Sequence, residues 1–142
     1  MSKANNLSGF NILHQNASSV GSIILESYNN NFKNLLLSDV IFLLNADEVK
    51  IDKQSNQFII YQGTHGGENA SLADVVLPGA AFTEKEGIFV NLEGRPQLAN
   101  KASYPPGNAK EDWKIIKALS DVFNKPLNLS LIHISEPTRR RT

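Results

Sequence analysis

Residues 63–67, with the sequence GTHGG, form the stretch whose composition most directly suggests chemistry. They follow an apolar run, and the backbone amides of a glycine-rich loop in that position can cradle a phosphate group. The spacing of the glycines matches neither the dinucleotide-binding pattern nor the P-loop pattern. The stretch therefore predicts either a phosphate-binding loop or a tight turn between a strand and a helix.

Residues 73–97 carry a second group of polar side chains, which stand in turns between short apolar runs. Turns at the ends of buried strands are where α/β proteins usually place their ligand sites. The side chains include both charges, so we expect ion pairs and turn hydrogen bonds that lock two loops together rather than catalysis. The residues concerned are Thr83, Glu84, Lys85, Glu93 and Arg95.

Metal-dependent and nucleophilic chemistry find little support in the sequence. His65, Glu68 and Asp74 lie near one another in the chain, but their spacing fits no zinc motif and no second histidine is close. His14 has no second ligand at i+4 either, and we expect it on a helix surface. The absence of cysteine excludes disulfides, thiolate metal sites and cysteine-ligated iron–sulfur clusters within these residues. We therefore predict no catalytic residue and no metal site.

Three apolar runs, at residues 39–44, 58–61 and 74–77, predict short strands. The first is expected to be buried on both faces, as in a parallel sheet, and the second is also expected to be buried. The connections between them are polar or helical, including about one helical turn at residues 68–72, and this pattern favours βαβ topology. A further run at 88–90 predicts one more strand. The predicted fold class is α/β, a partial Rossmann-like parallel sheet with flanking helices.

Helical periodicity predicts two longer helices beside this sheet. One begins near residue 8, where apolar residues start to recur at helical spacing. The other should be capped by Asn108, with Glu111 three residues later completing a capping-box pattern. We expect Trp113 and Leu119, on the apolar stripe of this second helix, to pack against the sheet.

Length and composition restrict the class of protein. The chain has 142 residues, of which 41% are hydrophobic and 20% charged, enough for one small globular domain. Fourteen basic and fourteen acidic residues cancel, so no net charge calls for nucleic acid or an anionic membrane. The longest apolar run, residues 40–44, is far too short to span a membrane. We expect no nucleic-acid partner and no direct membrane insertion.

The sequence divides into three parts. Residues 1–7 are polar, and we expect them to be loose, whereas residues 8–127 form the α/β domain. Residues 129–139 resemble the translation of a transposase adapter used to prepare sequencing libraries. We therefore expect residues 128–142 to be a disordered tail, an artefact that replaced the true C-terminus, and we assign no function to it.

A long, multi-part pattern runs from residue 58 to residue 119. It consists of FIIYQGTHGG, LADVVLPGAAFTEKEGIFVNLEGRPQ and PPGNAKEDWKIIKALS. The elements ADVVLP, EKEG, N-x-EGR-x-Q, PPG and DW are similar to those of molybdopterin oxidoreductases. Within that family the pattern resembles the large iron–sulfur subunit (G-type) of NADH-quinone oxidoreductase, respiratory complex I, over residues 8–127. Two departures are residues 63–67, where the family tends to carry a second histidine and an aspartate, and Ile88, where threonine is usual.

This resemblance implies an internal, C-terminal part of a much longer subunit, whose cysteine-rich N-terminal part holds [4Fe-4S] and [2Fe-2S] clusters. The present part would hold no cofactor, and its fold would be a relic that binds no molybdopterin. In molybdenum-containing relatives the loops after these strands approach the pterin dinucleotide. On that analogy the nearest candidates are Gln62, Gly63, Thr64 and His65, although we expect none of them to bind a ligand here.

The function implied by the resemblance is structural support of electron transfer from NADH to quinone, coupled to proton translocation. The partners would be other subunits of the complex I peripheral arm. The location would be the cytoplasmic face of a bacterial inner membrane, or the matrix side in a mitochondrion. One alternative is a fragment of an active molybdopterin enzyme such as a formate dehydrogenase, which needs an upstream cysteine or selenocysteine and an intact pterin pocket. A second alternative is a standalone scaffold or binding protein.

Overall fold

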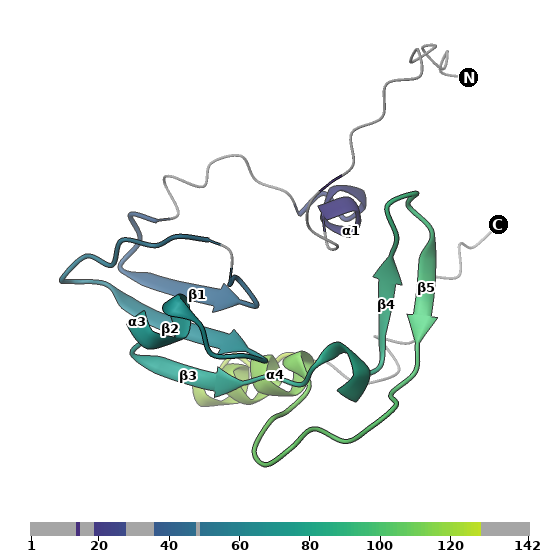
Figure 1. The fold of residues 1–142 in the computed structure, drawn as a ribbon. Helices are drawn as coiled ribbons and strands as arrows, with labels where there is room; N and C mark the ends of the chain where they lie inside the picture. The colour runs from purple at the N-terminus through teal and green to yellow at the C-terminus, as the bar shows by residue number, and fades with distance from the viewer. Residues whose placement is uncertain (1–13, 15–18, 28–35, 48, 129–142) are drawn as a thin grey trace, which may run out of the picture. The chain divides into compact units, whose positions relative to one another are not determined.

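The structure is a computed structural model that describes residues 14, 19–27, 36–47 and 49–128 (Figure 1). The chain divides into two compact units, one made of residues 1–28 with 89–97 and the other of residues 29–88 with 98–142. The second unit carries a three-stranded sheet. The predicted loose N-terminus and the predicted tail from residue 129 lie outside the described residues.

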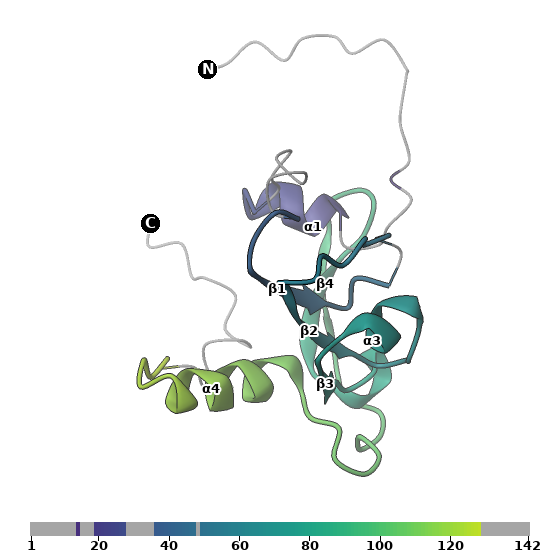
Figure 2. The same cartoon turned by 90° about the vertical axis from the view of Figure 1, so that its left-hand side faces the viewer.

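The three-stranded sheet consists of β1 (Val40–Leu44), β2 (Phe58–Gly63) and β3 (Val75–Pro78) in the order β1-β2-β3 (Figure 2). Both pairs of neighbours are parallel, with Val40 opposite Phe58 and Ile60 opposite Val75. The α/β class and the parallel sheet predicted from the sequence are therefore confirmed. β2 is two residues longer than predicted, so Gly63 belongs to the strand and the loop after it begins at Thr64.

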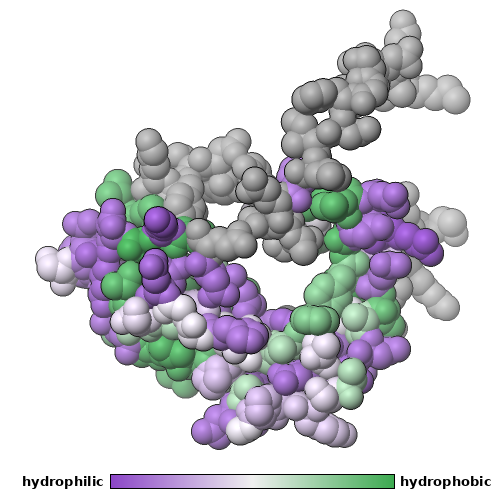
Figure 3. Space-filling model, in the orientation of Figure 1, coloured by the Kyte–Doolittle hydropathy of each residue, from purple (hydrophilic) through white to green (hydrophobic). Residues whose placement is uncertain are grey.

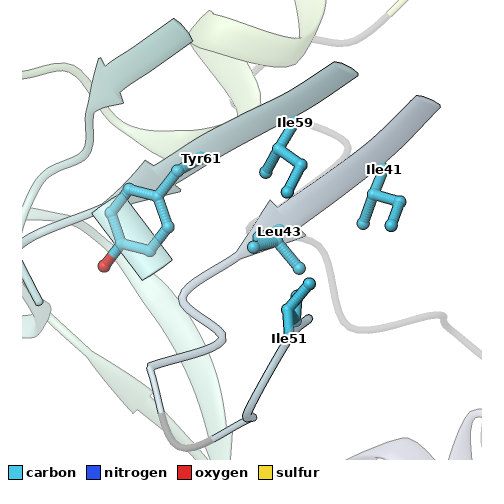
Figure 4. Close-up of a cluster of buried hydrophobic side chains, with 5 residues drawn as sticks. All are labelled: Ile41, Leu43, Ile51, Ile59 and Tyr61. Carbon is cyan, nitrogen blue, oxygen red and sulfur yellow. The ribbon is translucent and has the colours of Figure 1, made fainter. Parts of the chain in front are cut away.

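One face of the sheet carries the hydrophobic core (Figure 4). Alternate side chains of a strand point to opposite faces, and the buried ones here are Ile41 and Leu43 of β1 and Ile59 and Tyr61 of β2. Ile51, from the connection between the two strands, packs against them. Partly buried residues of the connections complete this cluster: Leu36, Ala46, Val49, Ala70 and Ala73.

The other face of the sheet remains largely exposed. In β1 the side chains of Val40, Phe42 and Leu44 are 58%, 40% and 46% exposed. The prediction that residues 39–44 form a strand buried on both faces is therefore wrong for the described residues, because the connections between the strands cover one face only. Figure 3, in the orientation of Figure 1, shows green, hydrophobic surface interspersed with purple, hydrophilic surface on the described residues that face the viewer.

Two helices of the second unit flank the sheet. α3 (Glu68–Leu72) is the single helical turn predicted between β2 and β3. α4 (Asp112–Val122) begins later than predicted, because Glu111 is its N-cap residue rather than its third helical residue. The expected capping box with Asn108 is therefore absent from this helix start. Among the described residues, no helix has the length and apolarity needed to cross a bilayer.

A two-stranded sheet pairs β4 (Gly87–Val90) with β5 (Pro96–Ala99). β4 was predicted, whereas β5 was not, since proline and glutamine begin it. In the first unit, α1 (Ser19–Ile24) is the described part of the helix predicted from residue 8. Gly21 lies so close to Val90 that a Cβ atom at Gly21 would contact its side chain at 3.6 Å. His14 is exposed but lies outside any described helix, so its predicted position on a helix is not confirmed.

Candidate binding site at the carboxyl edge of the sheet

A cavity of about 330 Å³ opens where β2 and β3 end. The carboxyl edge of a parallel sheet is the usual ligand-binding position in α/β folds. Thr64 and His65 contribute to the cavity from the loop after β2, and Gly79 from the loop after β3. Pro78, the last residue of β3, also lines the cavity. The remaining lining residues come from two later loops and the short 3₁₀ helix Phe82–Glu84: Ala81, Glu84, Pro106, Asn108 and Ala109.

Gln62 is fully buried beside this cavity and connects three elements. Its Nε2 donates to Asp112 Oδ1 at 2.9 Å, which links β2 to the first residue of α4. The other carboxylate oxygen of Asp112 accepts a hydrogen bond from Lys85 Nζ at 2.5 Å. Gln62 Oε1 has no hydrogen-bond partner among the described residues. This network holds α4 against the end of the sheet, and an acidic residue at a helix start also complements the helix dipole.

Gly63 is required at its position by close packing rather than by backbone conformation. A Cβ atom on Gly63 would lie only 2.7 Å from Cε1 of the Tyr61 ring and would overlap the hydroxyl as well. The Gly63 carbonyl accepts a hydrogen bond from the Gly79 amide at 2.8 Å, which pairs the ends of β2 and β3. The carbonyl group of Gly63 is thus already used in a hydrogen bond between β2 and the residue after β3.

Tyr61 ties together two loops at the carboxyl edge. Its hydroxyl lies within hydrogen-bonding distance of the Asp47 carboxylate, in the loop after β1, and of the His65 carbonyl oxygen at 2.8 Å, in the loop after β2. Burial, together with the hydrogen bond to Asp47 and its charge, raises the pKa of Tyr61 to about 12. The hydroxyl therefore stays protonated at neutral pH and acts as a donor.

Thr64 and His65 are the candidates from the sequence whose side chains face solvent. Thr64 Oγ1 lies 2.9 Å from His65 Nδ1, so the two side chains form one polar pair at the cavity. Glu84 is the acidic lining residue, and one of its oxygens accepts a hydrogen bond from the Ala81 amide at 2.9 Å. Within the described lining there is no lysine or arginine.

Asp74 lies at the opposite, amino edge of the sheet. Its carboxylate accepts hydrogen bonds from the Ile59 amide and from Lys53 Nζ, both at 2.7 Å. The hydrogen bond from Lys53, followed by that from the Ile59 amide, lowers the pKa of Asp74. The structure thus separates Asp74 from His65, and the described residues contain no group of three or more potential metal ligands.

The expected lock between the turns of residues 73–97 is replaced by other contacts. Lys85 forms its ion pair with Asp112, outside that stretch. The backbone amides of Glu93 and Arg95 both donate to Asn91 Oδ1, at 3.1 and 2.8 Å, and shape the turn between β4 and β5. The described structure gives neither side chain an ion pair, so the predicted ion pair is wrong for these two residues, whereas their backbone amides do make turn hydrogen bonds.

Sequence reasoning missed two residues that organise the edge. Asp112 was placed inside a helix rather than at its start, where its carboxylate reaches both Gln62 and Lys85. Asp47 follows the strand predicted at residues 39–44, and no role was predicted for it. A tyrosine in the middle of an apolar strand was the available signal for Asp47, because a buried hydroxyl requires a partner.

Comparison with known proteins adds independent information on these residues. The sequence model of the molybdopterin oxidoreductase family matches residues 1–122 of the chain. The chain is 50% identical to the NADH-ubiquinone oxidoreductase 75 kDa subunit of Reclinomonas americana over 131 residues, covering 88% of this chain and 19% of that protein.

Two other relatives agree with this match. The G-type subunit of NADH-quinone oxidoreductase from Rickettsia felis is 54% identical over 112 residues, which cover 79% of this chain and 16% of the relative. The mitochondrial NADH-ubiquinone oxidoreductase 78 kDa subunit of Candida albicans is 48% identical over 120 residues, which cover 84% and 16%. The chain thus spans less than a fifth of the length of these curated relatives.

Proposed function

The chain belongs to the molybdopterin oxidoreductase family, and we propose that it is a structural part of the large iron–sulfur subunit of an NADH:quinone oxidoreductase. The observation that carries the proposal is the identity of about half of all residues, over most of the chain, with relatives that bear this name. In this role the chain supports electron transfer from NADH to quinone, coupled to proton translocation. The enzymatic activity belongs to the whole complex.

The same proposal assigns the iron–sulfur clusters, the partners and the location of the chain. The [4Fe-4S] and [2Fe-2S] clusters belong to the cysteine-rich part of the longer subunit, since this chain contains no cysteine. Its partners are the other subunits of the peripheral arm. The complex places the chain on the cytoplasmic face of a bacterial inner membrane, or on the matrix side in a mitochondrion.

Gln62, Gly63, Thr64 and His65 bind no pterin in this proposal. A pterin dinucleotide carries phosphate groups, which favour cationic side chains and free backbone amides. The described lining of the cavity offers no such cation and includes Glu84. The Gln62 side chain is fully buried, and its amide group donates a hydrogen bond to Asp112. These residues do not fit the cofactor, and their polar groups instead hold strands, loops and α4 together.

A segment exchange tests the structural role. Residues 8–127 replace the matching segment of the large iron–sulfur subunit in a bacterial relative, in cells that lack the native subunit. We expect the complex to assemble and to keep NADH:quinone reductase activity. The Ile59→Ala change in the chimera should reduce assembly, because it opens a cavity in the core, whereas Ser55→Ala in an exposed turn should not. A protease-resistant chimera that assembles no complex would refute the proposal.

Two further measurements separate the alternatives. Metal analysis of the polypeptide made from the intact locus should find iron and no molybdenum, and stoichiometric molybdenum would instead support an active molybdopterin enzyme. Resequencing the locus should show a reading frame that continues past residue 128 into different residues, with cysteine clusters upstream. A frame that starts at Met1 and ends at Thr142 would favour the standalone protein.

A further inference from the structure

The cavity at the carboxyl edge of the sheet carries an acidic charge that no described cation balances. Glu84 is the acidic residue of its lining, and the ion pairs between described residues do not include it. Glu84 Oε2 accepts a hydrogen bond from the Ala81 amide, so the lone pairs of Oε1 remain for another donor. Lys85, the next residue, forms its ion pair with Asp112 instead. Glu84 therefore lines the cavity without a described counter-ion.

The backbone donors of the lining are mostly used by the fold. Four of the nine lining residues donate their amide to a described partner at 2.8–3.1 Å: Gly79, Ala81, Glu84 and Ala109. Two more, Pro78 and Pro106, have no N–H group at all. Six of the nine residues therefore offer no free amide to a ligand. An anion in this cavity would lack both the cationic side chains and most of the amides that anion sites use.

Hydrogen-bond acceptors, in contrast, are left over around the cavity. The carbonyl oxygens of Ala81 and Pro106 each accept one backbone hydrogen bond, and a carbonyl oxygen has two lone pairs. Beside the cavity, Gln62 Oε1 is buried and has no described partner. Buried acceptors without a partner are rare and costly, so they favour a ligand that donates hydrogen bonds. With Glu84 in the lining, the ligand that fits best is a cation rich in N–H groups.

We propose that this cavity binds a guanidinium group, paired with the carboxylate of Glu84. A guanidinium is a planar cation with several N–H donors and no acceptor, and its fork matches a carboxylate together with a neighbouring oxygen. The volume of about 330 Å³ is small for a ligand pocket and suits such a group better than a dinucleotide. This preference follows from the lining and does not depend on the proposed function. The group is either an arginine side chain from outside the described residues or a free alkylguanidinium compound.

Glu84→Gln is the variant that tests this assignment, made in the polypeptide expressed from the intact locus. A glutamine oxygen can still accept the Ala81 hydrogen bond, so the turn is kept while the charge is lost. Glu86→Gln is the matched control, because Glu86 is exposed and does not line the cavity. Both variants and the parent protein are labelled with phenylglyoxal, which reacts with arginine, and the labelled residues are mapped by mass spectrometry. The same proteins are titrated with methylguanidinium chloride in a calorimeter.

The two sources of the guanidinium group give different results. If an arginine side chain fills the cavity, that arginine should be protected from phenylglyoxal in the parent and Glu86→Gln proteins. In Glu84→Gln it should react at least about tenfold faster, because a hydrogen bond to a charged group is lost. If the ligand is a free compound, methylguanidinium should bind the parent and Glu86→Gln proteins at least about tenfold more tightly than Glu84→Gln.

The remaining outcomes contradict the proposal. It is wrong if no arginine is protected and methylguanidinium does not bind, or if Glu84→Gln and Glu86→Gln behave alike in both measurements. Inorganic phosphate serves as the opposite probe. Phosphate binding to the parent protein that becomes tighter in Glu84→Gln would show that the cavity takes an anion, and would overturn the proposal.

Discussion

The two faces of the three-stranded sheet are built from the same strands but have different neighbours. On the covered face, Ile59 is fully buried and Ile41 is nearly so, because the connections between the strands fold back over them. On the opposite face, here called the open face, Val40 and Phe42 are 58% and 40% exposed although they are equally apolar. The difference lies in what covers each face and not in the strands.

The contrast shows that one face of the sheet is covered by residues close in sequence to the strands, whereas the other face is not. On β1 and β2 the covered face is closed by residues of the two connections, among them Ile51 and Ala70, which are sequence neighbours of the strands. The open face requires residues from elsewhere. In the isolated chain, substitutions on the covered face should therefore change stability, whereas substitutions on the open face should change self-association. Four sets of substitutions test this difference between the faces.

The largest effect should follow from emptying the covered face. Ile59→Ala removes a fully buried side chain and leaves a cavity, so the free energy of unfolding of the isolated chain should fall by about 2–5 kcal/mol. Ile60 is the next residue of β2, and its side chain lies on the open face. Ile60→Ala should lower the free energy of unfolding by less, because Ile60 is only half-buried. Urea unfolding of both variants measures the difference. Equal losses would mean that both faces are closed in solution.

Gly63→Ala should have the next largest effect. The added methyl group overlaps the Tyr61 ring, so the ring must move and weaken its contacts with Asp47 and His65. Overpacking of this kind costs about 1–3 kcal/mol. Gly66→Ala is the matched control, because a Cβ atom there has no neighbour within 4 Å. If thermal unfolding shifts equally for the two variants, the packing argument for Gly63 is wrong.

The sheet was predictable from sequence because its signal is local. The apolar runs that became β1, β2 and β3 are bounded by polar turns, and the single turn of α3 fits the room between two parallel strands. The burial of both faces was not predictable in this way. A run such as 40–44 shows that a strand has apolar sides, but the covering segment of each side is set by tertiary context.

The candidate site was predictable in position but not in chemistry. The sequence placed Thr64 and His65 after a strand, and in the structure both residues line a cavity at the carboxyl edge. The sequence did not reveal that the side chain of Gln62 hydrogen-bonds to the first residue of α4. The capping-box pattern predicted an earlier helix start, whereas α4 begins at Asp112. Partners 50 residues apart leave no spacing pattern, so only the fold could bring them together.

Asp74 provides a smaller, pH-dependent test at the amino edge of the covered face. Its folded-state pKa is lowered by Lys53 and the Ile59 amide. Its contribution to stability is therefore fully present above the unfolded-state pKa, about 4, and is lost as the pH falls through the lower, folded-state value. Asp74→Asn should lower the free energy of unfolding at pH 6. It should also make the further loss of stability below pH 4 smaller than in the unmodified chain. Asp52→Asn, in the exposed stretch next to Lys53, controls for general loss of negative charge.

The smallest effect on stability should come from the open face, and it provides the sharpest contrast. Val40→Thr keeps a β-branched side chain at an exposed position, so the free energy of unfolding should change by about 0.5 kcal/mol or less. Ile41→Thr, on the next residue, buries a hydroxyl group in the core and should cost about 1–3 kcal/mol.

Association of the isolated chain should show the reverse order. Val40→Thr makes the open face more polar, so it should lower self-association in sedimentation velocity at matched concentration. Ile41→Thr leaves that face unchanged and should not reduce association among folded molecules. If Val40→Thr costs as much stability as Ile41→Thr and leaves association unaltered, the open face is already covered within the 142 residues, and the two faces differ less than the structure indicates.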